Sequence, residues 1–406
     1  MELVFNTLHN GIRLVHYTIP GDVAYCGLVM NTGSRDEAAD QHGMAHFVEH
    51  MLFKGTRKRK AYHILSRLDD VGGELNAYTT KEETAVHASF MREHYSRAME
   101  LISDIVFNPV MPPREIEKEK DVVLEEINSF LDNPAELIFD EFEEQVFAGQ
   151  PIGHNILGTP ESVRSFSQEA LFRFVAANYP TDQMVFCSAG NISRKKILQL
   201  FSKYFSPYPG KQRIPRPSMQ CHYKPISVTR EMKTFQNHCI IGNVAYDLKN
   251  KRRTAMFLLN NILGGQGLNS RLNLSLREKK GLAYNIESSY NPYCDTGLFS
   301  IYFGTDEENL GKSISLTMAE LNKIRSVRLG HLQLGRAKNQ IKGYLARGYE
   351  NHENLMLSLA KSLLVFDCIE SKDEIFRKID SITADDILEA AKDILDPSAL
   401  STLIYK

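Results

Sequence analysis

A proline-rich segment divides this chain of 406 residues almost into halves. Residues 206–218 read SPYPGKQRIPRPS, with four prolines and one glycine. Proline restricts φ and lacks a backbone N–H donor, so such a run interrupts helices and strands and is typical of a linker. The length also suits two domains better than one. We therefore predict a first domain over residues 1–206, a linker over 207–218 and a second domain over 219–406.

The two halves show the same order of predicted elements, namely strands, an apolar helix and further strands. Alternating apolar residues predict strands, and apolar residues spaced by three and four predict helices. In the first half the segments are 11–19, 23–34, 44–53 and 75–91, and in the second they are 238–246, 254–265, 284–290 and 297–305. This order predicts an internal repeat. Thr159 followed by Pro160 predicts a further helix start.

The charge balance limits the classes of partner. The formal net charge is −2, which argues against a nucleic-acid-binding protein with a dominant basic face. No segment approaches the roughly 20 apolar residues that span a bilayer, and the first residues do not resemble a secretory signal. We expect a soluble protein that binds neither membrane nor nucleic acid.

The cysteines indicate a reducing compartment. They are scattered along the chain and form no CxxC pair, which is typical of buried thiols rather than a disulfide framework or a thiolate zinc site. We therefore expect a cytoplasmic location. The six residues are Cys26, Cys187, Cys221, Cys239, Cys294 and Cys368.

The segment GMAHFVEHMLFKGT, residues 43–56, carries the polar residues that point to chemistry. On the predicted helix, His46 and His50 are four residues apart, so their imidazoles lie on one face. Two imidazoles at that spacing can bind one divalent ion, and zinc favours nitrogen ligands. Glu49 lies on nearly the same face and can reach a water on the metal. The order HxxEH is the inverse of HExxH and is the inverzincin signature.

This motif alone leaves two interpretations open. The three polar residues can be a coincidence on a surface or core helix, or they can form a metal site. A catalytic zinc needs a third protein ligand and keeps one position open for water. A long acidic helix predicted between Pro113 and Asn133 supplies the candidates Glu115, Glu117, Glu119, Glu125 and Glu126.

HFVEHMLFKGT, together with the downstream EKDVVLEEI, resembles the M16 metallopeptidases, which include pitrilysin, insulin-degrading enzyme and mitochondrial processing peptidase. In that family the third zinc ligand lies in a helix of the pattern E-x6-E. The match implies Glu126 as the third ligand and Glu119 as a residue that orients the site. Seven residues make two helical turns, so these two share a face, whereas Glu125 points about 100° away.

GHNILGTPESV also matches a recurring segment of the family, and two further segments carry residues that the resemblance assigns to substrate binding. NAYTTKEETAVHASF resembles the family's edge strand beside the metal, where Asn76 and Ala77 would hold substrate backbone. SRLNLSLREKKGLAYNI resembles the stretch that delivers an arginine and a tyrosine across the cleft, here Arg277 and Tyr284. A surface salt bridge and a core tyrosine are the alternatives for this last pair.

The resemblance covers nearly the whole chain and implies the fold class α+β. It implies two α/β repeats, each a mixed, mostly antiparallel sheet with helices packed on one face, that face each other as a clamshell. It also implies one Zn²⁺ per protomer, held by His46, His50 and Glu126, with Glu49 as general base. The activity implied is that of a metalloendopeptidase acting on extended, unfolded peptides.

The family also implies a dimer, either of identical chains or with a degenerate chain of the same type. Two other functions stay open. One is a non-catalytic scaffold or binding subunit, against which the intact ligand set argues. The other is a zinc hydrolase acting on a non-peptide amide, and the edge strand with Arg277 and Tyr284 favours peptides instead.

Overall fold

The computed structural model describes residues 3–216, 219, 223–232 and 234–406. The chain forms two compact units, each including a segment from the other half of the sequence. Unit 1 comprises Met1–Ser129, His154–Pro217 and Arg347–Ile369, and unit 2 comprises Phe130–Gly153, Ser218–Ala346 and Glu370–Lys406. The boundary expected over residues 207–218 stays a prediction, and residues 217 and 218 lie outside the described part of the chain.

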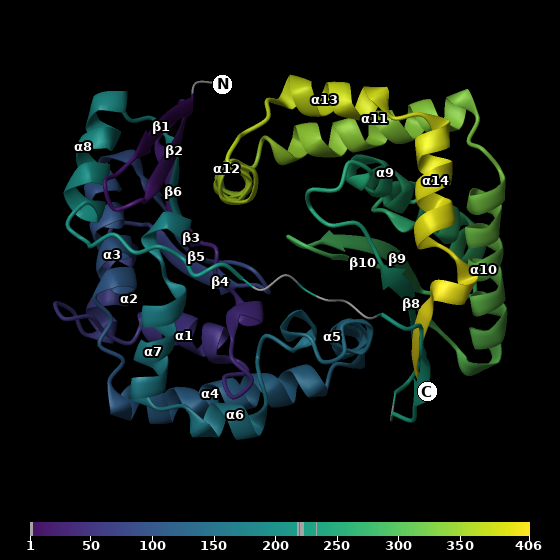
Figure 1. The fold of residues 1–406 in the computed structure, drawn as a ribbon, viewed down its shortest axis with the longest axis horizontal. Helices are drawn as coiled ribbons and strands as arrows, with labels where there is room; N and C mark the ends of the chain where they lie inside the picture. The colour runs from purple at the N-terminus through teal and green to yellow at the C-terminus, as the bar shows by residue number, and fades with distance from the viewer. Residues whose placement is uncertain (1–2, 217–218, 220–222, 233) are drawn as a thin grey trace. The chain divides into compact units, whose positions relative to one another are not determined.

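Unit 1 is built on a six-stranded sheet with the order β1-β2-β6-β3-β5-β4. Neighbouring strands are antiparallel except β2 and β6, which are parallel. The strands are β1 (Leu3–Thr7), β2 (Arg13–Thr18), β3 (Val23–Met30), β4 (Glu74–Thr79), β5 (Thr84–Met91) and β6 (Met184–Gly190). The outermost strand β4 is therefore an edge of this sheet (Figure 1).

Most helices of unit 1 bury their apolar side chains against one face of this sheet. Because side chains alternate along a strand, Cys26, Leu28 and Met30 of β3 face this core, which also contains Phe47 and Val48. The helices are α1 (Met44–Leu52), α2 (Ala61–Asp69), α3 (Tyr95–Phe107), α4 (Pro113–Leu131), α6 (Pro160–Ser165), α7 (Gln168–Asn178) and α8 (Arg194–Phe205).

The other face of the same sheet is covered by α12 (His352–Phe366), which comes from the second half of the chain. Val29 and Val185 point to this side and pack with Met356 and Leu359. The sheet is thus buried on both faces, which explains why every residue of β6 is buried.

Unit 2 has a five-stranded sheet with the order β7-β11-β8-β10-β9. Only β7 and β11 are parallel. The strands are β7 (Ser227–Arg230), β8 (Asn237–Val244), β9 (Asn285–Pro292), β10 (Gly297–Thr305) and β11 (Ser401–Tyr405). One face packs against α9 (Arg253–Gly264), α10 (Leu310–Ser326) and α14 (Ala384–Ile394). The other packs against α5 (Pro134–Val146), which comes from the first half of the chain (Figure 1).

The helices of unit 2 are α5 (Pro134–Val146), α9 (Arg253–Gly264), α10 (Leu310–Ser326), α11 (His331–Gly348), α13 (Lys372–Ser381) and α14 (Ala384–Ile394). No helix in the described part of the chain is long and apolar enough to cross a membrane.

The expected fold class is confirmed. Both sheets are mixed and mostly antiparallel, and the predicted helices at α1, α4 and α9 and the hairpin β4–β5 are present. The expectation of helices on one face was incomplete, because α12 and α5 each cover the second face of a sheet. Thr159 and Pro160 start α6 as predicted, with Thr159 accepting a hydrogen bond from the Ser162 backbone N–H.

Candidate metal centre

The helix that carries HFVEH starts at a tightly packed glycine. Gly43 has a φ of +86°, which favours glycine, and a Cβ there would lie 2.6 Å from the Leu157 carbonyl oxygen. Next to it, Ser162 Oγ donates a hydrogen bond of 2.7 Å to the His42 carbonyl. The loop before α6 and the first turn of α6 therefore hold the start of α1, three residues before His46.

Three side chains from α1 and α4 converge on one point. Glu126 Oε2 lies 3.8 Å from His46 Nε2 and 3.8 Å from His50 Nε2. One potential ligand atom from each of the three residues lies within 4.8 Å of the other two. The long-range packing of α4 against the same core as α1 brings Glu126 there.

Glu119 lies two turns before Glu126 on α4 and has different partners. Its Oε1 is 2.9 Å from His50 Nδ1, and its Oε2 is 2.5 Å from Lys54 Nζ. The Glu119 side chain is 6% exposed and that of Glu126 is 44% exposed. Glu119 therefore contacts Nδ1 of the His50 imidazole, whereas Glu126 lies near the Nε2 atoms of both rings.

The ionisation of these groups follows from burial and charge. Burial, together with the charge of the neighbouring His50, lowers the pKa of His46 to about 4. Burial opposes the charged form of His50, but the hydrogen bond and charge of Glu119 outweigh it and raise the pKa of His50. Burial likewise opposes ionisation of Glu119, yet its bonds to His50 and Lys54 lower its pKa.

This donor set fits a zinc ion. Tetrahedral zinc with bonds near 2.1 Å places its ligand atoms roughly 3.4 Å apart, close to the two separations of 3.8 Å. A metal-bound histidine commonly donates its other ring N–H to a carboxylate, as His50 Nδ1 does to Glu119. The low pKa of His46 keeps its imidazole neutral, which metal binding requires.

Glu49 lies beside this cluster and has the features of a general base. Burial raises the pKa of its carboxyl, while a hydrogen bond from Thr79 and the nearby His50 lower it in part. Within the described part of the chain, Glu49 Oε2 is buried and has no hydrogen-bond partner. A carboxylate of raised pKa with one unengaged oxygen suits proton transfer near neutral pH.

The predicted substrate strand lies next to α1 in unit 1. Asn76 and Ala77 are in β4, opposite His87 and Val86 of β5. Asn76 is exposed and Ala77 is half-buried. Among the described residues, no strand pairs with the outer side of β4, so its backbone groups can accept an added strand.

Arg277 and Tyr284 belong to unit 2. Arg277 lies in a π-helical turn, Asn273–Glu278, and Tyr284 directly precedes β9. Both side chains are exposed, and Tyr284 is 69% exposed, so it is no core tyrosine. Their contact with a substrate in unit 1 stays a prediction.

Three residues at the site were missed by the sequence reasoning. Lys54 neutralises Glu119, Thr79 hydrogen-bonds Glu49, and the buried Glu37 binds the first turn of α1. Lys54 lies two residues beyond the end of α1, so helical spacing does not identify it. Thr79 and Glu37 come from other segments, and no local pattern points to them.

Comparisons with protein families agree with this arrangement. Residues 14–160 match the family described as insulinase (peptidase family M16), and residues 165–341 match the peptidase M16 inactive domain. The cluster of His46, His50 and Glu126 lies wholly within the first match.

Individual proteins match over nearly the full chain. An uncharacterized zinc protease of Streptomyces coelicolor is 32% identical over 96% of this chain and 86% of its own length. The uncharacterized zinc protease YmxG of Bacillus subtilis is 31% identical over 98% of this chain and 97% of its own length.

Two solved structures share the fold. A protease from Helicobacter pylori has a TM-score of 0.91 at 20% identity and covers 100% of this chain and 99% of its own. A peptidase M16 inactive domain from Pseudomonas fluorescens has a TM-score of 0.92 at 18% identity and covers 100% of this chain and 98% of its own. From the family matches and the zinc protease relatives, the chain belongs to peptidase family M16, in its short two-domain form.

Proposed function

We propose that this protein is a zinc-dependent endopeptidase that cleaves extended, unfolded peptides. The observation that carries the proposal is the convergence of His46 Nε2, His50 Nε2 and Glu126 Oε2, with the buried carboxyl of Glu49 beside them. Relatives named zinc proteases support the same class of reaction.

His46, His50 and Glu126 would hold the zinc. When bound, zinc lowers the pKa of a water and polarises the scissile carbonyl. Glu49 accepts the proton of the attacking water and later gives it to the leaving amine. Glu119 keeps the imidazole of His50 in the tautomer that leaves Nε2 free.

The substrate would add a strand to the outer edge of β4, with its backbone near Asn76 and Ala77. Backbone pairing of this kind accepts many side chains and requires an extended chain. This favours peptides over a small non-peptide amide. We assign Arg277 and Tyr284 as further substrate contacts by resemblance to the family.

The proposal includes one zinc per protomer and a dimer of M16 chains, most simply a homodimer. The buried thiols of Cys26, Cys187 and Cys239 fit a reducing compartment such as the cytoplasm. Light scattering on the purified chain tests the dimer.

The test of the function is Glu49→Gln. The amide keeps the volume of the side chain and leaves the three proposed ligands in place, so zinc content should match the wild type. The amide cannot accept a proton, so hydrolysis of a fluorogenic peptide should fall by about 10²–10⁴-fold. Metal analysis and peptide hydrolysis are measured on the same preparations.

The outcomes separate the alternatives. Normal hydrolysis by a zinc-loaded Glu49→Gln protein would exclude Glu49 as the base, and loss of zinc would make it a ligand. A wild-type chain that binds zinc but cleaves no peptide in a complex mixture would instead support the scaffold or binding subunit.

A further inference from the structure

The start of the metal-binding helix is held by a carboxylate outside the HxxEH motif. Glu37 accepts hydrogen bonds from the backbone N–H groups of Gly43 (3.0 Å) and Ala45 (2.8 Å). The N-terminal residue Gly43 has no side chain with which to cap α1, and the first N–H groups of a helix lack partners within it. Glu37 supplies the missing acceptor, and it is only 7% exposed.

Because they join Glu37 to two different backbone N–H groups, the two bonds restrict both the position of the first turn of α1 along the helix axis and its rotation about that axis. Ala45 directly precedes His46, so a shift of the Ala45 backbone moves the first proposed ligand. Burial raises the pKa of the Glu37 carboxyl to about 8, while the two backbone bonds and Lys81 favour its charged form. Each oxygen accepts a backbone N–H, an arrangement that favours the ionised carboxylate, as does the positive end of the helix.

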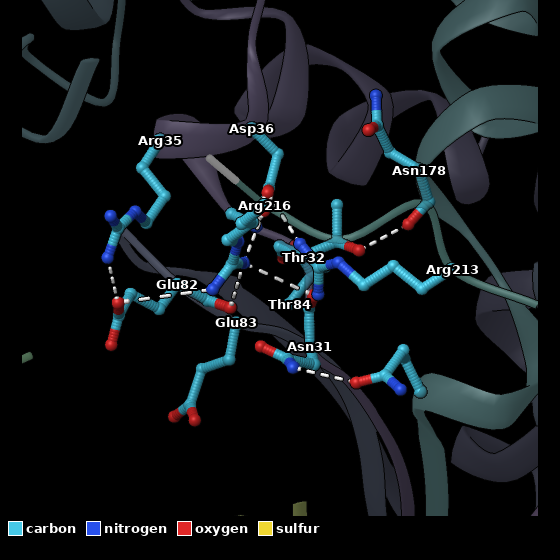
Figure 2. Close-up of polar contacts among 12 residues, drawn as sticks. Asn31, Thr32, Arg35, Asp36, Glu82, Glu83, Thr84, Asn178, Arg213 and Arg216 are labelled. Carbon is cyan, nitrogen blue, oxygen red and sulfur yellow. Dashed lines mark hydrogen bonds and ion pairs between the residues drawn. The ribbon is translucent and has the colours of Figure 1, made fainter. Parts of the chain in front are cut away.

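The residue before Glu37 is clamped from another part of the chain. Asp36 is 5% exposed and receives Arg213 Nη2 at 2.6 Å and Arg216 Nε at 2.5 Å. A second Arg216 nitrogen binds the other Asp36 oxygen, which makes the pair bidentate. Figure 2 shows both arginines meeting at Asp36, with Arg216 also reaching the Glu82 carbonyl.

Residues next to this cluster also contact the turn of the β4–β5 hairpin, which contains the predicted substrate strand β4. The Ser34 and Arg35 N–H groups donate to the carbonyls of Thr80 and Lys81, in the turn between β4 and β5. A Cβ on Gly33 would lie 2.3 Å from the Thr80 carbonyl oxygen, so the two turns are in close contact. Residues 33–37 are thus held between the β4–β5 turn and the segment that contains Arg213 and Arg216.

We propose that Glu37 is a positioning residue for the metal centre and that the ion-pair cluster of Asp36, Arg213 and Arg216 holds it in place. The catalytic consequence rests on the peptidase activity of the proposed function, whereas the effect on metal binding rests only on its zinc site. In this arrangement, the segment after α8 stabilises the geometry of His46 through residues 36 and 37.

The test compares two pairs of variants. Glu37→Gln replaces one accepting oxygen by an N–H₂ group that faces a backbone N–H. Its control is Glu143→Gln, which changes a glutamate of the same 7% exposure that accepts a hydrogen bond from Tyr293 in unit 2. Arg216→Lys keeps the charge and loses the bidentate contact, and its control is Arg13→Lys. Arg13 and Arg216 side chains are each 17% exposed, and Arg13 binds Asp367.

Zinc affinity is measured by competition with a chromophoric chelator, and the geometry of the ligands by the visible spectrum of the Co²⁺-substituted protein. Glu37→Gln should weaken zinc binding about tenfold, in the range found when groups supporting metal ligands are removed. It should alter the Co²⁺ spectrum and lower kcat per bound zinc more than it raises KM. Arg216→Lys should act in the same direction by about threefold. Both controls should retain the wild-type zinc affinity and spectrum.

If Glu37→Gln had the same zinc affinity and Co²⁺ spectrum as its control Glu143→Gln, the proposed role of Glu37 would be overturned. Unchanged values for Arg216→Lys would overturn the role of the cluster. If Glu37→Gln fails to fold, Arg216→Lys decides, because it leaves Glu37 in place. If the wild type binds zinc but cleaves no peptide, the proposed function fails, while zinc affinity and spectrum still decide this inference.

Discussion

Glu119 and Glu126 show how two identical residues on one helix face acquire different chemistry. Both project from α4, two turns apart. Glu119 is buried and neutralised by Lys54 and His50, so it cannot turn towards a metal without leaving a lysine unpaired. Glu126 is nearly half exposed, and its oxygen faces both imidazoles. The two glutamates therefore differ in their surroundings and not in their type, and this difference supports a positioning role for Glu119 and a ligand role for Glu126 in the proposed function.

Glu126→Gln should weaken zinc binding and abolish peptide hydrolysis, because an amide is a poor zinc ligand compared with a carboxylate. Glu125→Gln is the matched control, since it makes the same change one residue earlier on an exposed position. The zinc content and peptide hydrolysis rate of the two variants show which of the two glutamates is the third ligand. The reverse pattern would place the third ligand at Glu125.

His16 should make the stability of unit 1 depend on pH. The side chain is 0% exposed on β2, and burial lowers its pKa to about 4 from 6.5. The folded pKa lies below the unfolded value, so the unfolded chain binds more protons between these pH values. The neutral form therefore stabilises the fold above about pH 6.5, and this contribution, roughly 3 kcal/mol, is lost as the pH falls towards 4.

His16→Gln removes that titration. Urea unfolding of the metal-free wild type and variant at pH 7 and pH 4 should show the wild type losing roughly 3 kcal/mol more than the variant. Other titrating groups are common to both proteins and cancel in the comparison. An equal loss in the two proteins would contradict the prediction.

At the scale of elements, α12 is the clearest case of a helix placed by distant packing. Its buried residues meet the face of the unit 1 sheet opposite to α1. His87 of β5 and Glu353 of α12 add a contact of 2.8 Å between their side chains. A helix from residues 352–366 thus completes a core whose strands all come from the first half of the chain.

Met356→Ala should lower the free energy of unfolding of unit 1 by about 3 kcal/mol, because Met356 is fully buried and the truncation leaves a cavity. Urea unfolding measures the change. Leu332→Ala serves as control, since Leu332 is 77% exposed and should change stability by less than about 0.5 kcal/mol. Equal effects of the two substitutions would show that α12 contributes little to the core.

At the scale of the whole molecule, each unit is built on a mixed sheet, but the repeat does not extend to the HxxEH motif. The position of HFVEH in the first half corresponds to LLNNI in α9 of the second half, which has no imidazole or carboxylate. Among the described residues, His46, His50 and Glu126 form a cluster of potential ligands that lies within one unit. The description of the second family match as an inactive domain agrees with this division.

The purified chain should therefore contain one zinc per protomer, measured by metal analysis after purification without chelators. His50→Ala should remove it, because one imidazole and one carboxylate leave too few ligands. A stoichiometry near two, or full zinc content in His50→Ala, would contradict the assignment of a single site.

The sequence by itself determined the local elements that present the site. Spacing of three and four predicted α1 and α4, and alternation predicted the β4–β5 hairpin. The i, i+4 spacing placed the two histidines on one helix face, and the resemblance to the M16 family selected Glu119 and Glu126 from the glutamates of α4. These features depend on interactions within one helix or between adjacent strands. A short stretch of sequence therefore contains the periodicity that predicts each element.

Only the tertiary structure decided which distant groups meet. It brought Glu126 to the two histidines, placed α12 and α5 on sheets formed by the other half of the chain, and set Glu37 against the first turn of α1. An apolar helix face does not specify which sheet it covers. The sequence around a buried glutamate likewise contains no spacing pattern that identifies its distant hydrogen-bond partner. Such contacts are selected by the burial and hydrogen bonding of the whole chain at once, which local patterns do not contain.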